Sequence, residues 1–297
     1  MVSYLCVFIV TLIVARPAED PAKEAAITDV STPSSIWSEL QMTDKDIHRG
    51  ELILVNNKNS YIFPETEELV YVHEKKSGSY SVQDYGQRLK PQALEALNRM
   101  LDDFRLCFKD AGVNIISTYR TYEFQEQLMQ KYTQQMRAQE AAKWCAQPGG
   151  SEHHTGLAVD LGVLSDGVPL EFDGQGDYSW IARNCDIYGF IVRYTADKTE
   201  ITGFYDEPWH LRYVGTPHAA LMKKHGFCLE EYIDWLKKYP WEGEHLRCGG
   251  ERGIYEIYYV AANSSGLTQI PTPLNGEYTV SGNNTDGFIV TIRCTEG

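Results

Sequence analysis

The sequence predicts an α+β fold, with helices around a sheet and a small β appendage at the C-terminus. Two long stretches carry apolar residues at spacings of three and four, as helices do, and shorter apolar runs typical of strands lie between them. From Gly249 onward the pattern indicates strands alone. A chain of 297 residues is long enough to bury a full core, so we expect one large domain plus the appendage.

The N-terminal region indicates export. Residues 4–15 are apolar apart from Thr11, which is too short a run to cross a membrane but typical of the core of a signal peptide. We interpret residues 1–15 as a signal peptide or a signal anchor, so membrane anchoring through this segment stays open. Residues 16–47 are rich in Ala, Pro, Glu, Asp, Ser and Thr without an apolar period, and they predict a flexible tether.

The main domain is expected over residues 48–245. It begins with short strands at residues 52–55 and 69–72, and a further strand is expected at residues 113–117. The helix between them is predicted by one apolar stripe: Leu94, Leu97, Leu101, Phe104 and Phe108.

Tyr119 and Arg120 follow the strand and precede a second helix, which runs toward Trp144. Its stripe has a period of four: Phe124, Leu128, Tyr132 and Met136. The later elements of the main domain are a helix at 178–188, a central strand at 189–194, and helices at 217–225 and 229–239. The appendage, residues 246–297, is expected to contain strands at 254–260, 277–280 and 287–292.

Residues 151–160, which read SEHHTGLAVD, hold the first group of polar residues with a chemical role. His153 stands at the loop end of a predicted strand over residues 157–163, and Asp160 lies inside that strand. Imidazole nitrogen and carboxylate oxygen are zinc ligands, and a catalytic zinc keeps three protein ligands and a water. This segment supplies two such ligands, so the third must come from elsewhere.

Residues 207–215, EPWHLRYVG, offer the missing ligand. His210 begins another predicted strand, and Glu207 precedes it by three positions. A carboxylate at that distance from a ligand is close enough to move protons without itself binding the metal.

Together with Tyr119-Arg120, these two segments resemble the VanY-like D-alanyl-D-alanine carboxypeptidases, zinc enzymes of bacterial cell-wall metabolism. The family pattern is Ser-x-His-x-x-Gly-x-Ala-x-Asp followed by Glu-x-Trp-His, and every fixed position is present here. The resemblance covers roughly residues 50–240. It implies a central antiparallel sheet that carries a zinc site, and removal of the terminal D-alanine from peptidoglycan stem peptides.

The resemblance also implies roles for the matching residues. His153, Asp160 and His210 would hold zinc, which lowers the pKa of its bound water towards ~7. Glu207 would take a proton from that water and return it to the leaving amine. Arg120 would face the scissile carbonyl and stabilise the negative charge that develops on it.

Two further positions match the substrate pocket of the family, Ser151 and Gln125. Either of them could instead cap a helix or a turn. We expect the side chain of His154 to point away from the metal, and Trp209 to pack on the sheet rather than contact the substrate.

Other functions stay open beside this one. A related zinc peptidase could cut free D-Ala-D-Ala as a dipeptidase, or cross-linked wall as an endopeptidase. A binding module without catalysis and a scaffold with a structural zinc are the other two alternatives. The presence of Glu207 and Arg120 beside three candidate ligands argues against both of these.

The net charge limits the kinds of partner that the protein could bind, and the cysteine content bears on the compartment in which it works. A net charge of −14 argues against nucleic acid as a partner, because few basic groups are available to neutralise phosphates. Of the seven cysteines, six follow the predicted signal peptide, an even number that would allow disulfides in an exported protein. A Cys248–Cys294 disulfide could staple the appendage, and Cys145 and Cys185 could clamp the metal-binding segment. The oligomeric state is not indicated.

Overall fold

The computed structural model describes residues 37–165, 167–250 and 253–294. The chain divides into two compact units, residues 1–35 and 36–297, and the description below concerns the second. The predicted signal peptide and most of the predicted tether lie outside the described residues. Within the described ranges, no helix is long and apolar enough to span a membrane.

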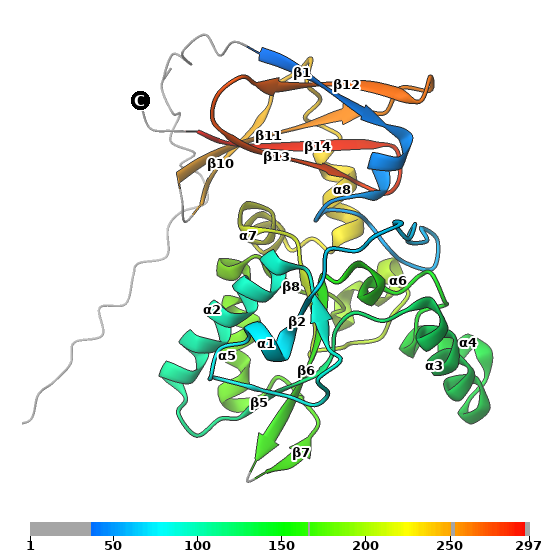
Figure 1. Ribbon diagram of the computed structural model, residues 1–297, viewed down its shortest axis with the longest axis vertical. Helices are drawn as coiled ribbons and strands as arrows, with labels where there is room; N and C mark the ends of the chain where they lie inside the picture. The colour runs from blue at the N-terminus through cyan, green and yellow to red at the C-terminus, as the bar shows by residue number, and fades with distance from the viewer. Residues whose placement is uncertain (1–36, 166, 251–252, 295–297) are drawn as a thin grey trace, which may run out of the picture. The chain divides into compact units, whose positions relative to one another are not determined.

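The fold is mixed α and β, and its largest sheet has six strands (Figure 1). The strands follow the order β3-β5-β6-β9-β8, and β7 pairs with the C-terminal end of β6. Every pair is antiparallel except β3 with β5. The strands are β3 (Ser81–Val82), β5 (Val113–Ser117), β6 (Ala158–Ser165), β7 (Val168–Leu170), β8 (Phe190–Val192) and β9 (His210–Tyr213).

β8 lies at the edge of this sheet, although we predicted a central strand for residues 189–194. Its apolar residues are buried by helices instead of a second neighbouring strand. Ile191 shares a core cluster with Ala219 and Met222 of α7 (Thr216–His225). The prediction of a central position was therefore wrong. It failed because a short apolar run does not distinguish a central strand from an edge strand that a helix covers.

The first predicted helix is confirmed as α2 (Pro91–Cys107), which begins with a proline at a position where helices tolerate it. Its apolar stripe faces the sheet. Leu97 and Phe104 of α2 share the main core cluster with Ile115 of β5 and Leu161 of β6. In Figure 1, α2 and α5 (Ser179–Asn184) lie on one side of the sheet, and α3 (Tyr122–Gln135) and α4 (Ala138–Trp144) lie on the other.

The second predicted helix is two helices, α3 (Tyr122–Gln135) and α4 (Ala138–Trp144). The chain breaks between them at Met136, which has an extended backbone with φ −147° and ψ 170°. Three of the four residues of the predicted stripe, Leu128, Tyr132 and Met136, pack against a small core that Met129 of α3 forms with Ala141 of α4. The fourth, Phe124, is 54% exposed, so the start of the predicted stripe was wrong.

The remaining helices and strands of this part are short. They are η1 (Asp44–His48), β2 (Val70–Tyr71), α1 (Val72–Lys75), β4 (Arg88–Leu89), η2 (Glu152–Thr155), η3 (Gly176–Tyr178), α5 (Ser179–Asn184), η4 (Cys185–Tyr188), η5 (Ala196–Lys198), α6 (Thr199–Thr202) and α8 (Leu229–Leu236). The strand predicted at residues 52–55 is wrong: these residues are buried but belong to no strand. The backbone of this segment is paired singly: the Ile53 carbonyl accepts from Arg212, and the Leu54 N–H donates to the Asn283 carbonyl.

The C-terminal region forms a second sheet of four antiparallel strands in the order β10-β11-β14-β13. These are β10 (Leu246–Gly250), β11 (Gly253–Ala261), β13 (Glu277–Gly282) and β14 (Gly287–Cys294). β12 (Leu267–Pro273) pairs instead with β1 (Trp37–Thr43).

The tether predicted for residues 16–47 was wrong at its C-terminal end, because residues 37–43 form a strand and residues 44–48 a 3-10 helix. Alternate residues of β1 are partly buried, and Leu40 and Met42 pack against the cluster that contains Ile270 of β12. This pairing joins residues more than 200 positions apart, so the local composition gave no sign of it.

The C-terminal sheet shares a core with the main domain. Ile257 of β11 and Ile289 of β14 lie in one cluster with Tyr232 of α8. His218 of α7 bridges the same elements, with Nδ1 2.8 Å from the Tyr232 hydroxyl and Nε2 2.9 Å from the Thr291 hydroxyl. The β appendage is therefore packed on the main domain through buried side chains.

The six cysteines of the described residues are free thiols, so neither of the two disulfides that the sequence left open is present. Cys248 pairs in register with Tyr255 of β11, and Cys294 pairs with Ile254 of the same strand, on its other side. Two strand spacings, roughly 10 Å, therefore separate them, and a disulfide needs Cα atoms within about 7 Å. Cys145 and Cys185 belong to two different core clusters.

Candidate metal centre and active site

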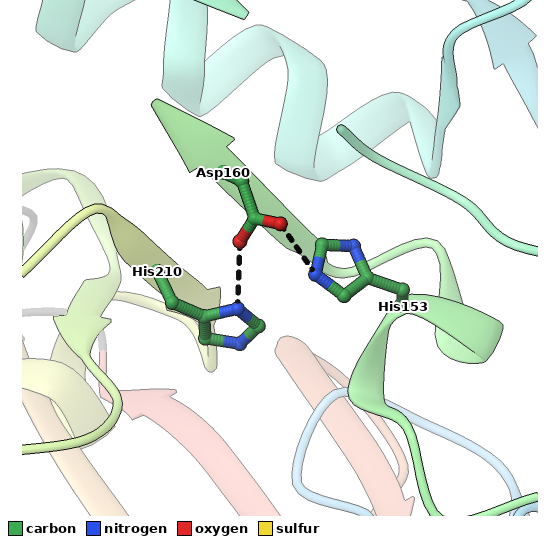
Figure 2. A group of neighbouring side chains, drawn as sticks. All are labelled: His153, Asp160 and His210. Atoms are coloured by element: carbon green, nitrogen blue, oxygen red, sulfur yellow. Dashed lines mark hydrogen bonds and ion pairs between the residues drawn. The ribbon is translucent and has the colours of Figure 1, made fainter. Parts of the chain in front are cut away.

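Three side chains from three elements converge on one point (Figure 2). His153 lies on η2, Asp160 on β6, and His210 is the first residue of β9. The antiparallel register pairs Asp160 directly with His210, which brings their side chains together. One nitrogen or oxygen from each of the three lies within 4.8 Å of the others.

A glycine makes the turn from η2 into β6. Gly156 has φ +69°, a left-handed conformation that side chains other than glycine rarely adopt. A Cβ at this position would also lie 2.5 Å from a methyl carbon of Leu69. The turn therefore requires glycine, and it sets the separation of His153 from Asp160.

Short polar contacts orient the two histidines and the carboxylate. Asp160 Oδ1 lies 2.8 Å from Nδ1 of His210, and its Oδ2 lies 3.1 Å from Nε2 of His153 (Figure 2). Nδ1 of His153 donates to the backbone carbonyl of Thr118 at 2.6 Å. That bond holds the proton on Nδ1 and leaves the Nε2 lone pair facing Asp160.

The electrostatics of the group suit a cation. Burial lowers the pKa of His153 to about 4, so this imidazole is neutral and able to act as a ligand. Burial alone would raise the pKa of Asp160, but the positive charge of Arg120 beside it holds this pKa well below its usual range. Two imidazole nitrogens and one ionised carboxylate form the donor set that zinc accepts in catalytic sites, so these residues fit the ion.

Arg120 reaches the same point from the loop after β5. Its Nη2 lies 2.6 Å from Asp160 Oδ2, and its Nε donates to the hydroxyl of Ser117 at 2.9 Å. Gln125 lies behind it: its Oε1 accepts from Arg120 Nη1 at 3.4 Å, and its Nε2 donates to the Ala146 carbonyl at 2.8 Å. These contacts fix the guanidinium of Arg120 over the carboxylate.

Glu207 precedes β9 and lies within the same site. Its backbone N–H donates to the Tyr194 carbonyl at 3.0 Å, and its carbonyl accepts from the N–H of His210 at 3.0 Å. The side chain is 7% exposed, and burial raises its pKa to about 7. A carboxyl with a pKa near neutrality is suited to both taking and returning a proton.

A cavity of about 110 Å³ opens over the group. Six of the seven predicted site residues line it: Arg120, Ser151, His153, Asp160, Glu207 and His210. Gln125 does not appear in its lining and is fully buried behind Arg120. Trp209 lines the cavity and also packs against the main core cluster.

Other residues of the cavity wall were not predicted from the sequence. Tyr132 and Trp144 come from α3 and α4, while Tyr194 stacks on Phe204 at 4.5 Å between ring centroids. These residues lie outside the motifs. Tyr132 belongs to the predicted apolar stripe of the second helix, but that pattern predicts burial and not a place in the cavity wall. Glu152, between Ser151 and His153, was also missed, although an acid directly before a proposed ligand histidine is visible in the sequence.

His154 is turned away from the metal-binding group, as we expected. Its Nδ1 donates to the Arg120 carbonyl at 2.7 Å, and its Nε2 accepts from the Gly149 N–H at 3.1 Å. The ring packs among Phe63 and Tyr122. His154 therefore supports the loops around the site.

Paired histidines, a carboxylate, a buried glutamate and an arginine around one cavity are typical of metal-dependent hydrolases. Comparison with known proteins agrees with this class. The family model of VanY, D-alanyl-D-alanine carboxypeptidase, matches residues 86–216. A D-alanyl-D-alanine carboxypeptidase of Enterococcus faecium is 35% identical over 272 residues, covering 88% of this chain and 81% of the relative.

Solved structures give the same result. The vancomycin-resistance D,D-dipeptidase VanXYg, in complex with a D-Ala-D-Ala phosphinate analogue, has a TM-score of 0.76 at 32% identity and covers 86% of this chain and 99% of its own. A mutant of the vancomycin-resistance D,D-pentapeptidase VanY in complex with Zn(II) has a TM-score of 0.50 at 34% identity, covering 62% and 98%. The chain belongs to the VanY family of D-alanyl-D-alanine carboxypeptidases.

Proposed function

We propose that this protein is a zinc-dependent D-alanyl-D-alanine carboxypeptidase that removes the terminal D-alanine from peptidoglycan stem peptides. The convergence of His153, Asp160 and His210 beside Glu207 is the observation that carries the proposal. Family membership supports it, as does the Zn(II) complex of the VanY relative.

In this proposal His153, Asp160 and His210 hold the zinc ion. A bound zinc supplies Lewis-acid activation of the attacking water and of the scissile carbonyl. Glu207 takes the proton from the water and returns it to the leaving amine of D-alanine. Arg120 donates to the carbonyl oxygen as negative charge develops there, a contribution often worth ~3 kcal/mol.

The two residues that match the substrate pocket of the family, Ser151 and Gln125, belong to the same proposal in different ways. Ser151 lines the cavity, and we assign its hydroxyl a contact with the bound peptide. Gln125 acts through Arg120, because its amide is used by Arg120 and the Ala146 carbonyl.

A dipeptidase activity is the second candidate, because the similarity to the D,D-dipeptidase VanXYg extends over 86% of this chain. The purified zinc-loaded protein should be assayed on a stem pentapeptide ending in D-Ala-D-Ala and on free D-Ala-D-Ala. Release of D-alanine from the pentapeptide at the higher kcat/KM supports the carboxypeptidase. Preference for the free dipeptide would replace it with the dipeptidase, and inactivity on both would reject both candidates.

Residues 48–245 are proposed as the catalytic domain, and residues 246–297 as the β appendage, which β1 extends. The composition of residues 4–15 supports export to the cell wall, either released or anchored. Fractionation of the bacterial host tests the location: recovery of the full-length chain in the cytosol would contradict export.

A further inference from the structure

Glu152 is a buried acid beside the proposed metal ligands, and neither the motif nor the proposed mechanism assigns it a role. It is 1% exposed and lies on η2 next to His153. Its two carboxylate oxygens face different partners. Oε1 accepts from Arg193 Nε at 2.8 Å and from Arg212 Nη1 at 2.9 Å. Oε2 lies 3.5 Å from Nε2 of His210.

The two arginines are themselves held in place. Both of their side chains are fully buried, and Arg193 makes a paired hydrogen bond to the carboxylate of Glu230 on α8, at 2.8 and 2.9 Å. Arg212 also donates to the backbone carbonyls of Glu51 and Ile53. Because both donors occupy Oε1, the second oxygen of Glu152 is left to face His210.

Glu152 Oε2 and His210 Nε2 are two of the four buried side-chain polar atoms that lack a hydrogen-bond partner among the described residues. They point toward each other. An acceptor and a ring nitrogen so placed require one proton between them, on Nε2 of His210.

A comparison with the other histidine supports that requirement. Nδ1 of His153 donates to the Thr118 carbonyl, and its opposite nitrogen faces Asp160. In His210 it is Nδ1 that faces Asp160, so its proton must reside on Nε2 when Nδ1 binds a metal. Each proposed ligand histidine thus has an acceptor behind it, a backbone carbonyl for His153 and the Glu152 carboxylate for His210.

We propose that Glu152 is a positioning residue that keeps the proton of His210 on Nε2 and so presents Nδ1 to zinc. This inference rests on the proposed zinc site. Arg193 and Arg212 both bind Oε1 of Glu152, and they thereby fix Oε2 as the oxygen that faces His210. Carboxylates behind metal-binding histidines orient the ring and raise its basicity, and their loss typically weakens metal affinity about 10–100-fold.

The substitution Glu152→Gln tests this directly because it is isosteric. Arg193 and Arg212 only donate, so the amide oxygen must take the Oε1 position. The amide NH₂ then points at Nε2 of His210 and favours an unprotonated Nε2. The ring proton moves to Nδ1, the nitrogen that zinc needs.

Glu230→Gln is the matched control, since it weakens the same buried ion-pair network at Arg193 without facing His210. Zinc dissociation constants should be measured by competition with a chromophoric chelator, with thermal unfolding of the metal-free proteins alongside. We expect Glu152→Gln to bind zinc about 10–100-fold more weakly, and Glu230→Gln to stay within about threefold of wild type. Equal zinc affinity in the two variants would overturn the inference.

A wild-type measurement decides the matter if Glu152→Gln fails to fold. Long-range ¹H–¹⁵N spectra of the zinc-loaded protein report which nitrogen of His210 carries the proton. A proton on Nε2 with slow exchange supports the inference, and a proton on Nδ1 overturns it. If wild-type protein binds no zinc at all, the proposed function fails instead.

Discussion

At the scale of single residues, the chemistry depends on which atom of each side chain faces the cavity. The fixed motif positions predicted His153, Asp160, Glu207 and His210 as site residues, because each belongs to a spaced pattern, and all four line one cavity. The contacts that set their protonation were not predictable, because the partners come from elsewhere in the fold. The Thr118 carbonyl behind His153 is one such partner.

Glu207→Gln tests the proposed proton carrier. The amide keeps the size of the side chain but cannot accept a proton from water, so turnover should fall at least ~100-fold with fold and zinc retained. Asp206→Asn is the matched control, because Asp206 is an exposed neighbouring acid. Steady-state release of D-alanine measures both. A fully active Glu207→Gln variant would show that another group moves the proton.

Arg120 is predicted to act on developing charge. Arg120→Ala should lower kcat about 100-fold, equivalent to ~3 kcal/mol, and Arg120→Lys should recover only part, because an ammonium lacks the planar paired donors. Zinc content and the thermal midpoint should be measured on the same preparations. If activity instead follows the folded fraction in both variants, Arg120 has a structural role only.

At the scale of elements, the pairing of β6 with β9 is what assembles the site, since its register sets Asp160 opposite His210. Long apolar stripes predicted α2 well, because its burial is decided within one stretch of sequence. Short strands were predicted less well. The position of β8 in the sheet and the partner of β1 both depend on segments distant in the chain.

The role of β1 gives a prediction at this scale. Leu40 packs toward the cluster around Ile270, while Gln41, the next residue of the strand, is exposed. Leu40→Ala should lower the free energy of unfolding by about 1–2 kcal/mol, because the side chain is only partly buried. Gln41→Ala should change it by less than about 0.5 kcal/mol. Denaturant unfolding of both variants gives the values, and equal effects would mean that β1 contributes no packing.

At the scale of the whole described unit, the C-terminal sheet is joined to the main domain through a shared core and through His218. The sequence located most strands of this sheet but not its attachment. Nothing local marks His218 as a contact between α7 and β14. The appendage is consequently expected to unfold together with the main domain.

His218 should make stability depend on pH. Burial lowers its pKa to about 3, from 6.5. Below pH 6.5 the unfolded state therefore binds more protons than the folded state, so this contribution to stability is lost as pH falls. Relative to His218→Gln, wild type should lose about 1 kcal/mol of stability from pH 6 to pH 5.

The control for this measurement is His225→Gln, which changes an exposed histidine at the end of the same helix. Urea unfolding at each pH gives the slopes. His225→Gln should keep the wild-type slope. If His218→Gln also keeps it, the imidazole of His218 is not the buried neutral group described above.

The zinc content of three proteins tests the central claim most directly: wild type, His210→Gln and His154→Gln. The two substitutions are chemically the same and change histidines of the same site region, but only His210 is a proposed ligand. Metal analysis after dialysis should find about one zinc per chain in wild type and in His154→Gln, and much less in His210→Gln. Full zinc in His210→Gln, or equal loss in both variants, would contradict the proposed metal centre.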